Sequence, residues 1–372
     1  MKNNGMINID NFEQQSIFSF PEFKITKKIR LIEMFGGIGS QAMALRDLGA
    51  DFEHHRLIEF DKYCVQAYNA IHHTDFVPTD IRNVHGKDLG IRERERYSYL
   101  LTYSFPCTDL SVAGNMKGMS KADWENGLST RSGLLWEVER ILKELPKEEL
   151  PDVLLMENVP QVHSEQNAND FMSWQDFLNS LGYFNFIKDL NAKDYGIPQN
   201  RERCFMVSIL SNDFISYEFP KPIKLEKVMK DFLEDEVDEK YYIQTEKADK
   251  LIKDLLAETN ISGGGQETHH NNMVLVVREV GRNPDNPTSR KKGLPLEQRL
   301  EIKEKEGLVG TLTTVQKDNM LLEDKDKKPR IRKLTPKECW RLMGYTDEDF
   351  DNAKNAGVSN SQLYKVSTLK IR

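Results

Sequence analysis

An alternation of apolar runs and helical segments, between about residues 28 and 210, most constrains how this chain can fold. The first unit is the apolar run KKIRLIEMF, a glycine-rich break and the helically spaced QAMALRDLGA. Three further pairs follow, whose apolar runs are HHRLIEF, YSYLLTYSF and PDVLLMENV. Strands that alternate with helices are typical of a mostly parallel, doubly wound sheet. The sequence therefore predicts an α/β fold.

The length of 372 residues exceeds what one ordinary core needs, so we expect a large domain that carries a smaller one. The βα rhythm stops near Asn212, and the next hundred residues mix charged segments of other kinds. Among them, LEQRLEIKEKEG is predicted to be helical and LVGTLTTV to be β-like. The expected divisions are an extension at 1–28, the α/β domain at 29–212, a second domain at 213–329 and a C-terminal segment at 330–372.

The C-terminal segment contains the helical stretch LTPKECWRLMGYTDEDFDNAKNAG. Thr335 stands directly before Pro336 and three residues before Glu338, which is the spacing of a helix N-cap. We therefore expect a helix to begin at this threonine.

Composition and charge narrow the class of protein. Apolar residues make up 38% of the chain and its formal charge is −7, which suits a soluble protein that meets any nucleic acid through local basic patches. The four cysteines form no C-x-x-C pair, and this predicts neither a zinc knuckle nor a disulfide framework but a reducing compartment. No long apolar stretch or signal peptide is evident. We expect a cytoplasmic protein with no bound metal.

The first strand-to-helix turn has the spacing of a cofactor-binding loop. Gly37-x-Gly39-x-x-Ala42 directly follows a predicted strand and opens a helix. Glu59 lies about 20 residues after Gly39 at the end of the next strand, where a carboxylate can bind ribose hydroxyls. Asp80 could end a third strand and bind an adenine amino group, although an ordinary turn aspartate fits as well. Together they predict an adenosine-bearing cofactor, and a nicotinamide dehydrogenase remains possible on these residues alone.

A cysteine follows another predicted strand in the sequence Phe105-Pro106-Cys107. Its thiol would be presented at the carboxyl end of the sheet, where open α/β folds bind ligands. A long polar loop follows it, and loops of that length are uncommon unless they are functional. The next strand ends at Glu157 on the same edge, so an acid would lie near the thiol. This pairing predicts a cysteine nucleophile with a carboxyl partner.

Seven short segments then occur in one order: MFGGIGS, LIEFD, PTDI, SFPCTDLS, MENV, YGIPQNRERCFMV and RKLTPKECWRLMGY. Because of these segments and their order, the chain resembles the DNA (cytosine-5) methyltransferases of bacteria and phages, over about residues 29–210 and 330–364. The resemblance implies a class I methyltransferase fold that uses S-adenosylmethionine. It also implies that the middle domain recognises the target sequence in double-stranded DNA.

The resemblance implies a role for each matching residue. Cys107 would add to C6 of a flipped-out cytosine, and Glu157 would bind the base at N3 and its exocyclic amine. The cofactor-binding residues would be Phe35, Gly37, Ile38, Gly39, Glu59, Phe60, Asp80, Ile81 and Pro106.

Basic and polar residues supply the remaining predicted contacts. Gln199, Arg201 and Arg203 alternate, so in an extended chain their side chains share one face. Arg203 would reach the base or the neighbouring carboxylate, Arg201 would contact phosphate or support the catalytic site, and Gln199 would contact DNA. Further predicted DNA contacts in the middle domain are Arg278, Arg282, Arg290, Lys291 and Lys292, together with the run KKPRIRK.

The chain departs from the family pattern at two places. After SNSQLYK, members normally continue with a Gly-Asn-Ser block and a further helix, whereas here VSTLKIR follows. We therefore expect a truncated chain, a monomer unless a second chain supplies this block. The motif FPCT replaces the FPCQ of many DNA enzymes, which leaves a tRNA-methylating enzyme or an inactive DNA-binding remnant as alternatives. An active enzyme would serve phage protection or a restriction system with a partner endonuclease.

Overall fold

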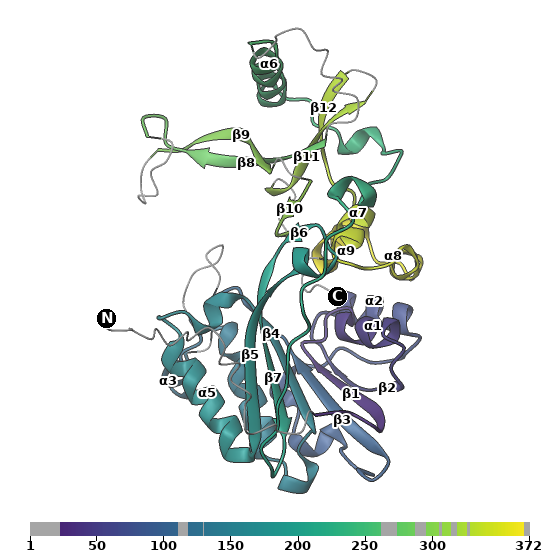
Figure 1. Ribbon diagram of the computed structural model, residues 1–372, viewed down its shortest axis with the longest axis vertical. Coiled ribbons are helices and arrows are strands. Elements are labelled where there is room, and N and C mark those ends of the chain that lie inside the picture. The colour runs from purple at the N-terminus through teal and green to yellow at the C-terminus, as the bar shows by residue number, and fades with distance from the viewer. Residues whose placement is uncertain are drawn as a thin grey trace, which may run out of the picture.

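A computed structural model describes the chain in two bodies joined by the C-terminal helices (Figure 1). The larger body is an α/β domain, and the smaller one is built on a second sheet. The described residues are 23–110, 118–128, 130–261, 274–286, 295–304, 307–313, 318–325 and 328–367.

Six strands form the central sheet in the order β2-β1-β3-β4-β7-β5. The first four are parallel, whereas β7 runs antiparallel to both of its neighbours. The predicted α/β class is therefore confirmed, with a mixed sheet. The strands are β1 (Lys28–Met34), β2 (Phe52–Ile58), β3 (Tyr97–Tyr103), β4 (Val153–Asn158), β5 (Tyr183–Asn191) and β7 (Glu202–Leu210).

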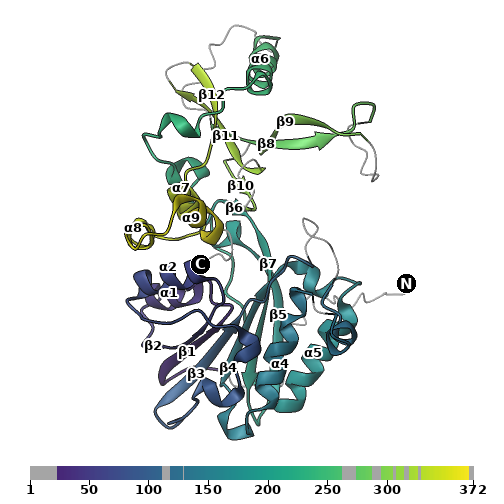
Figure 2. The same ribbon diagram turned by 180° about the vertical axis from the view of Figure 1, so that it is seen from behind.

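Helices cover the two faces of this sheet because the strands are apolar on both faces. Ile32 and Met34 of β1 join one core cluster with residues of α4 and α5, whereas Ile29 and Leu31 join another with Ala42 of α1. This alternation follows from the two-residue period of a strand. Figure 2 shows α4 and α5 side by side over one face. The helices of this body are α1 (Ser40–Asp47), α2 (Lys62–His72), α3 (Lys121–Glu125), α4 (Leu135–Lys143) and α5 (Ala168–Leu181).

Short 3₁₀ helices occupy many of the connections. They are η1 (Ile81–Asn83), η2 (Gly86–Leu89), η3 (Ser132–Leu134), η4 (Lys147–Glu149), η5 (Pro160–His163), η6 (Ala192–Tyr195), η7 (Met229–Phe232) and η8 (Glu239–Tyr241). Within the described ranges, no helix combines the length and the apolar character that crossing a membrane requires.

The smaller body is an antiparallel sheet in the order β12-β11-β8-β9, packed against α6. Leu251 and Ile252 of α6 contact the apolar side of this sheet. The elements are α6 (Glu246–Ile261), β8 (Val274–Arg282), β9 (Glu297–Glu304), β11 (Met320–Lys325) and β12 (Lys328–Lys333).

The helix predicted for LEQRLEIKEKEG is wrong, because this segment contributes β9. Leu300 and Ile302 point into the core against α6, and Arg299 and Glu301 alternate with them. The spacing of two between the apolar residues suits a strand, and pairing with β8 stabilises the strand over a helix. The described part of the β-like LVGTLTTV contributes β10 (Val309–Gly310), which pairs with β6 (Gln199–Asn200) of the larger body.

Three C-terminal helices return to the α/β domain beside α1 and α2. The predicted N-cap is confirmed, because Thr335 and Glu338 form a reciprocal capping box. Arg46 of α1 donates to both carboxylate oxygens of Asp349 at 2.7 and 3.1 Å. These contacts hold the C-terminal segment against α1 and α2. The helices are α7 (Pro336–Leu342), α8 (Asp347–Asn355) and α9 (Asn360–Ser367).

Candidate active site

The glycine-rich turn after β1 adopts backbone conformations that few side chains tolerate. Phe35, Gly37 and Gly39 have φ values of 54°, 61° and 85°. A Cβ atom on Gly39 would lie 2.2 Å from Nε2 of His72, so only glycine fits there. The neighbouring Ile38 is buried. This turn brings the N–H of Gly37 within 2.9 Å of the Glu59 carboxylate.

Glu59 and Phe60 lie together at the end of β2. The second carboxylate oxygen of Glu59 accepts the N–H of Asp61 at 2.8 Å, which fixes its orientation. Phe60 is 73% exposed although it is a large aromatic residue. A fixed carboxylate beside an open aromatic face suits the hydroxyls and the ring of an adenosine.

Asp80 does not end a strand, and that part of the prediction is wrong. It caps the 3₁₀ helix η1 by accepting the N–H of Arg82 at 3.0 Å, and it also pairs with the Arg82 guanidinium. Hydrogen bonding from this guanidinium lowers the pKa of Asp80. Ile81 is buried directly after it. The predicted cofactor site therefore combines two carboxylates, which can accept hydrogen bonds, with an exposed aromatic ring. This combination fits an adenosine-bearing cofactor, and Asp80 is held as a carboxylate.

The segment that presents Cys107 is fixed by hydrogen bonds to its backbone. Asn158 at the end of β4 donates to the carbonyl of Phe105 at 3.0 Å. Ser132 donates to the carbonyl of Pro106 at 2.7 Å. Cys107 itself is half-buried and follows β3 at the carboxyl edge of the sheet. The long loop that follows it lies partly outside the described residues, at 111–117 and 129.

Glu157 and Arg203 form an ion pair beside this cysteine. Nε of Arg203 lies 3.1 Å from Oε1 of Glu157, and the two side chains are only 12% and 9% exposed. They come from the adjacent antiparallel strands β4 and β7. The predicted contact between Arg203 and the neighbouring carboxylate is therefore present in the structure.

Burial and charge act in opposite directions on the Cys107 thiol. Burial raises the pKa of Cys107 above its ordinary value, and the Glu157 carboxylate adds to this rise. Arg203 and, more weakly, Arg201 lower the same pKa. The net shift is upward, so the resting group is a thiol that must lose its proton before it can attack.

Gln199 and Arg201 are buried where the two bodies and the C-terminal segment meet. The Gln199 amide donates to the carbonyl of Leu342 at 2.8 Å and accepts the N–H of Leu312 at 3.2 Å. Arg201 donates to the Leu312 carbonyl at 3.4 Å, and burial lowers its pKa to about 9. The buried position of Gln199 argues against the predicted DNA contact. Of the two roles predicted for Arg201, this position favours support of the site over phosphate binding.

Most of the described basic residues of the smaller body are paired with acids. Arg282 lies 2.6 Å from Glu301, and Arg278 lies 3.5 Å from the same carboxylate. Arg332 is buried between two carboxylates, so the prediction that all of KKPRIRK contacts phosphate is wrong for this residue. The predicted contacts Arg290, Lys291 and Lys292 lie outside the described residues.

The structure adds two side chains that sequence reasoning missed. Ser132 supports the backbone before Cys107, and Tyr345 forms a 2.8 Å hydrogen bond with Ser40 at the start of α1. Tyr345 is 305 residues from Ser40 along the chain, so no local spacing could have linked them.

Comparison with known proteins gives a consistent result. A model of the C-5 cytosine-specific DNA methylase family matches residues 29–367. The orphan methyltransferase M.SPBetaI of Bacillus phage SPbeta is 28% identical, with 91% of this chain and 93% of that protein covered. The type II methyltransferase M.HhaI of Haemophilus parahaemolyticus is 27% identical, with 91% and 88% covered. The structure of the S. pombe Dnmt2 methyltransferase shares the fold, with a TM-score of 0.60, 17% identity and coverage of 93% and 94%. The chain thus belongs to the C-5 cytosine-specific DNA methylase family.

Proposed function

We propose that this chain methylates C5 of cytosine within a short sequence of double-stranded DNA through a covalent bond to Cys107. The observation that carries the proposal is the placement of Cys107 beside the buried Glu157–Arg203 pair at the carboxyl edge of the sheet. A nicotinamide dehydrogenase, which the glycine-rich turn alone allowed, does not account for these residues or for the family.

Cys107 supplies the nucleophile in this mechanism. The thiol first loses its proton to solvent. Its sulfur then forms a bond to C6 of the cytosine, and the electron pair of the C5–C6 double bond moves onto C5. C5 thereby gains the electron density that it needs to accept a methyl group. Loss of the C5 proton to solvent then restores the double bond, and the C6–sulfur bond breaks to return the thiolate.

Glu157 and Arg203 stabilise the ring while the cysteine adds. The Glu157 carboxyl would bind N3 and the exocyclic amine, where charge changes as C6 is attacked. Arg203 holds this carboxyl in place through the 3.1 Å ion pair. Because C6 cannot be reached inside a stacked duplex, the cytosine must leave the helix first, which costs roughly a few kcal/mol.

S-adenosylmethionine is the cofactor of this family, and when bound it supplies an electrophilic methyl group. The Glu59 carboxylate would bind its ribose, Phe60 would cover its adenine ring, and Asp80 would accept a hydrogen bond from the adenine amine. The backbone at Gly37 has open space beside it, since a Cβ atom there would contact nothing within 4 Å, and the cofactor could approach the turn on this side.

The biological role that we propose is protective DNA modification. Its support is the similarity to orphan methyltransferases of Bacillus phages and to type II methyltransferases of bacteria. A type II role would include a partner endonuclease with the same recognition sequence.

Base-resolution methylation sequencing tests this function. DNA from a methylation-deficient bacterium that expresses the chain should carry 5-methylcytosine at one short motif. The Cys107→Ala variant should leave that motif unmethylated. The purified wild type, with S-adenosylmethionine, should also form a stable adduct with a duplex that contains 5-fluorocytosine, because fluorine at C5 cannot leave as a proton does.

Two results would contradict the proposal. Methylation that persists in Cys107→Ala would exclude the covalent mechanism. A folded wild type that methylates no cytosine in DNA would exclude the DNA function, and a parallel assay on tRNA would then test the alternative substrate.

A further inference from the structure

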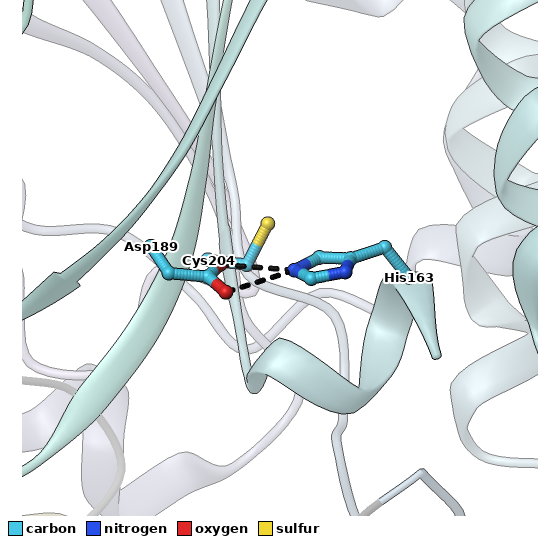
Figure 3. Close-up of side chains that lie close together, drawn as sticks. All are labelled: His163, Asp189 and Cys204. Carbon is cyan, nitrogen blue, oxygen red and sulfur yellow. Dashed lines mark hydrogen bonds and ion pairs between the residues drawn. The ribbon is translucent and has the colours of Figure 1, made fainter. Parts of the chain in front are cut away.

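Three potential metal ligands, none of them assigned to the reaction, converge on the face of the sheet that α5 covers. Figure 3 shows His163, Asp189 and Cys204 pointing toward one another from three segments of the chain. Their ligand atoms all lie within 4.8 Å of one another. His163 ends η5, Asp189 belongs to β5 and Cys204 belongs to β7.

The sheet register accounts for this convergence. Asp189 and Cys204 are directly paired across the antiparallel strands β5 and β7, so their side chains leave the same face. The 3₁₀ helix that follows β4 brings Nε2 of His163 within 3.0 Å of both Asp189 oxygens. The thiol of Cys204 also interacts with this carboxylate through a hydrogen bond.

We propose that His163, Asp189 and Cys204 bind a zinc ion. Imidazole nitrogen, carboxylate oxygen and thiolate sulfur are the ligands that Zn²⁺ takes in proteins, and three of them with one open position are a common set. Loss of the Cys204 proton gives the ligands a charge of −2, which the ion neutralises.

The geometry requires only a small closure of the three side chains. Bonds of about 2.0–2.3 Å in a tetrahedral site place ligand atoms roughly 3.3–3.8 Å apart. The observed separations of up to 4.8 Å need shifts of about 1 Å, which the partly exposed side chains of His163 and Asp189 can make when the ion replaces the hydrogen bonds between them. Cys204 is fully buried and supplies the fixed end of the site.

An adjacent pocket gives the ion access and leaves the fourth position open. Its volume is about 410 Å³, and His163 and Asp189 line it together with Phe171, Met172 and Ile187. Solvent can therefore reach the two exposed ligands, and water can complete the coordination.

Zinc bound there would join η5 and β5 to β7, the strand that also carries Arg203. Cys204 directly follows Arg203, and it pairs across the sheet with Asn158, which directly follows Glu157. With water as its fourth ligand, the ion would stabilise these segments directly behind the Glu157–Arg203 pair. This proposal does not depend on the methylation proposed above.

Cobalt substitution tests the site on the full chain. After treatment with EDTA and dialysis, the protein should bind one equivalent of Co²⁺ with thiolate-to-metal charge-transfer absorption and the intense visible bands of four-coordinate cobalt. Zn²⁺ should displace Co²⁺ and abolish these bands, because it binds such ligands more tightly. Cys204→Ala should remove the charge-transfer absorption, and His163→Gln should weaken Co²⁺ binding at least 10-fold.

A matched cysteine variant separates this site from the nucleophile. Cys107→Ala should keep the cobalt spectrum unchanged, although it removes the only partly exposed thiol among the described residues. Circular dichroism checks that each variant is folded, and the exposed His163→Gln replaces Cys204→Ala if the latter does not fold. The proposal is overturned if Co²⁺ does not bind stoichiometrically, if the spectrum survives in the folded Cys204 and His163 variants, or if it is lost in Cys107→Ala.

Discussion

Single side chains around Cys107 set the reactivity of its thiol. Burial raises the pKa of Cys107, Glu157 raises it further, and Arg203 and Arg201 lower it. The thiolate fraction at neutral pH is therefore smaller than that of an exposed cysteine. The alkylation rate of Cys107 should therefore still increase with pH at values where an ordinary cysteine is already ionised and its rate no longer rises. Measuring the iodoacetamide rate against pH, with Cys107→Ala as the blank, checks this direction.

Glu157→Gln should separate thiol reactivity from methylation. Removing this carboxylate lowers the pKa of Cys107 and leaves the Arg203 charge unneutralised, so alkylation at neutral pH should become faster. Methylation should fall about 10²-fold or more, because the positioned acid is lost. Glu202→Gln is the matched control, since it makes the same change at an exposed position of β7 and should alter neither rate. Slower alkylation in Glu157→Gln would contradict the electrostatic account.

Between elements, a buried ion network joins β12 to α7. Arg332 donates to both Glu338 oxygens at 2.8 Å and to Glu323 of β11 at 2.8 Å. Glu338 also accepts the N–H of Thr335 at 2.8 Å, which completes the helix cap. One carboxylate thus fixes the angle at which the antiparallel sheet of the smaller body meets the C-terminal helices.

Glu338→Gln should destabilise the protein strongly. The substitution leaves Arg332 buried with only one carboxylate partner, and breaking a buried pair in this way costs about 3 kcal/mol or more. Urea unfolding followed by circular dichroism measures the loss. Arg330 lies on β12 with Arg332, but its carboxylate partner Glu239 is exposed. Glu239→Gln should therefore change stability little. Equal effects of the two substitutions would show that burial does not determine the strength of this network.

The molecule as a whole carries a charge of −7, so its affinity for DNA must come from a few local cations. Arg282 and Arg330 are already paired with Glu301 and Glu239 in the structure. We therefore expect the main phosphate contacts from Arg290, Lys291 and Lys292.

Replacing these three residues with glutamine should weaken DNA binding on every sequence. The slope of log affinity against log salt concentration should become shallower by about 2.7, since each phosphate contact contributes about 0.9. Fluorescence anisotropy over a salt series measures this slope. Arg282→Gln is the control and should leave the slope nearly unchanged, and a larger effect from it than from the triple variant would refute the assignment.

The sequence by itself determined the α/β domain and the position of Glu59, Cys107 and Glu157 at the carboxyl ends of its strands. Strand and helix periods are local properties, and the apolar runs that end at Glu59, Cys107 and Glu157 lie on parallel strands whose ends meet at one edge. The order of short motifs then identified the family, which the match over residues 29–367 confirms.

Only the tertiary structure decided which polar residues face inward. Gln199 and Arg332 look like DNA contacts in the sequence, and Arg201 could have contacted phosphate or supported the site. All three are buried by segments that pack on them only in the folded chain. Tertiary contacts also decided the conformation of β9, since pairing with β8 and packing against α6 outweighed the helical propensity of its sequence. The meeting of His163, Asp189 and Cys204 depends on sheet register, which no local spacing in the sequence encodes.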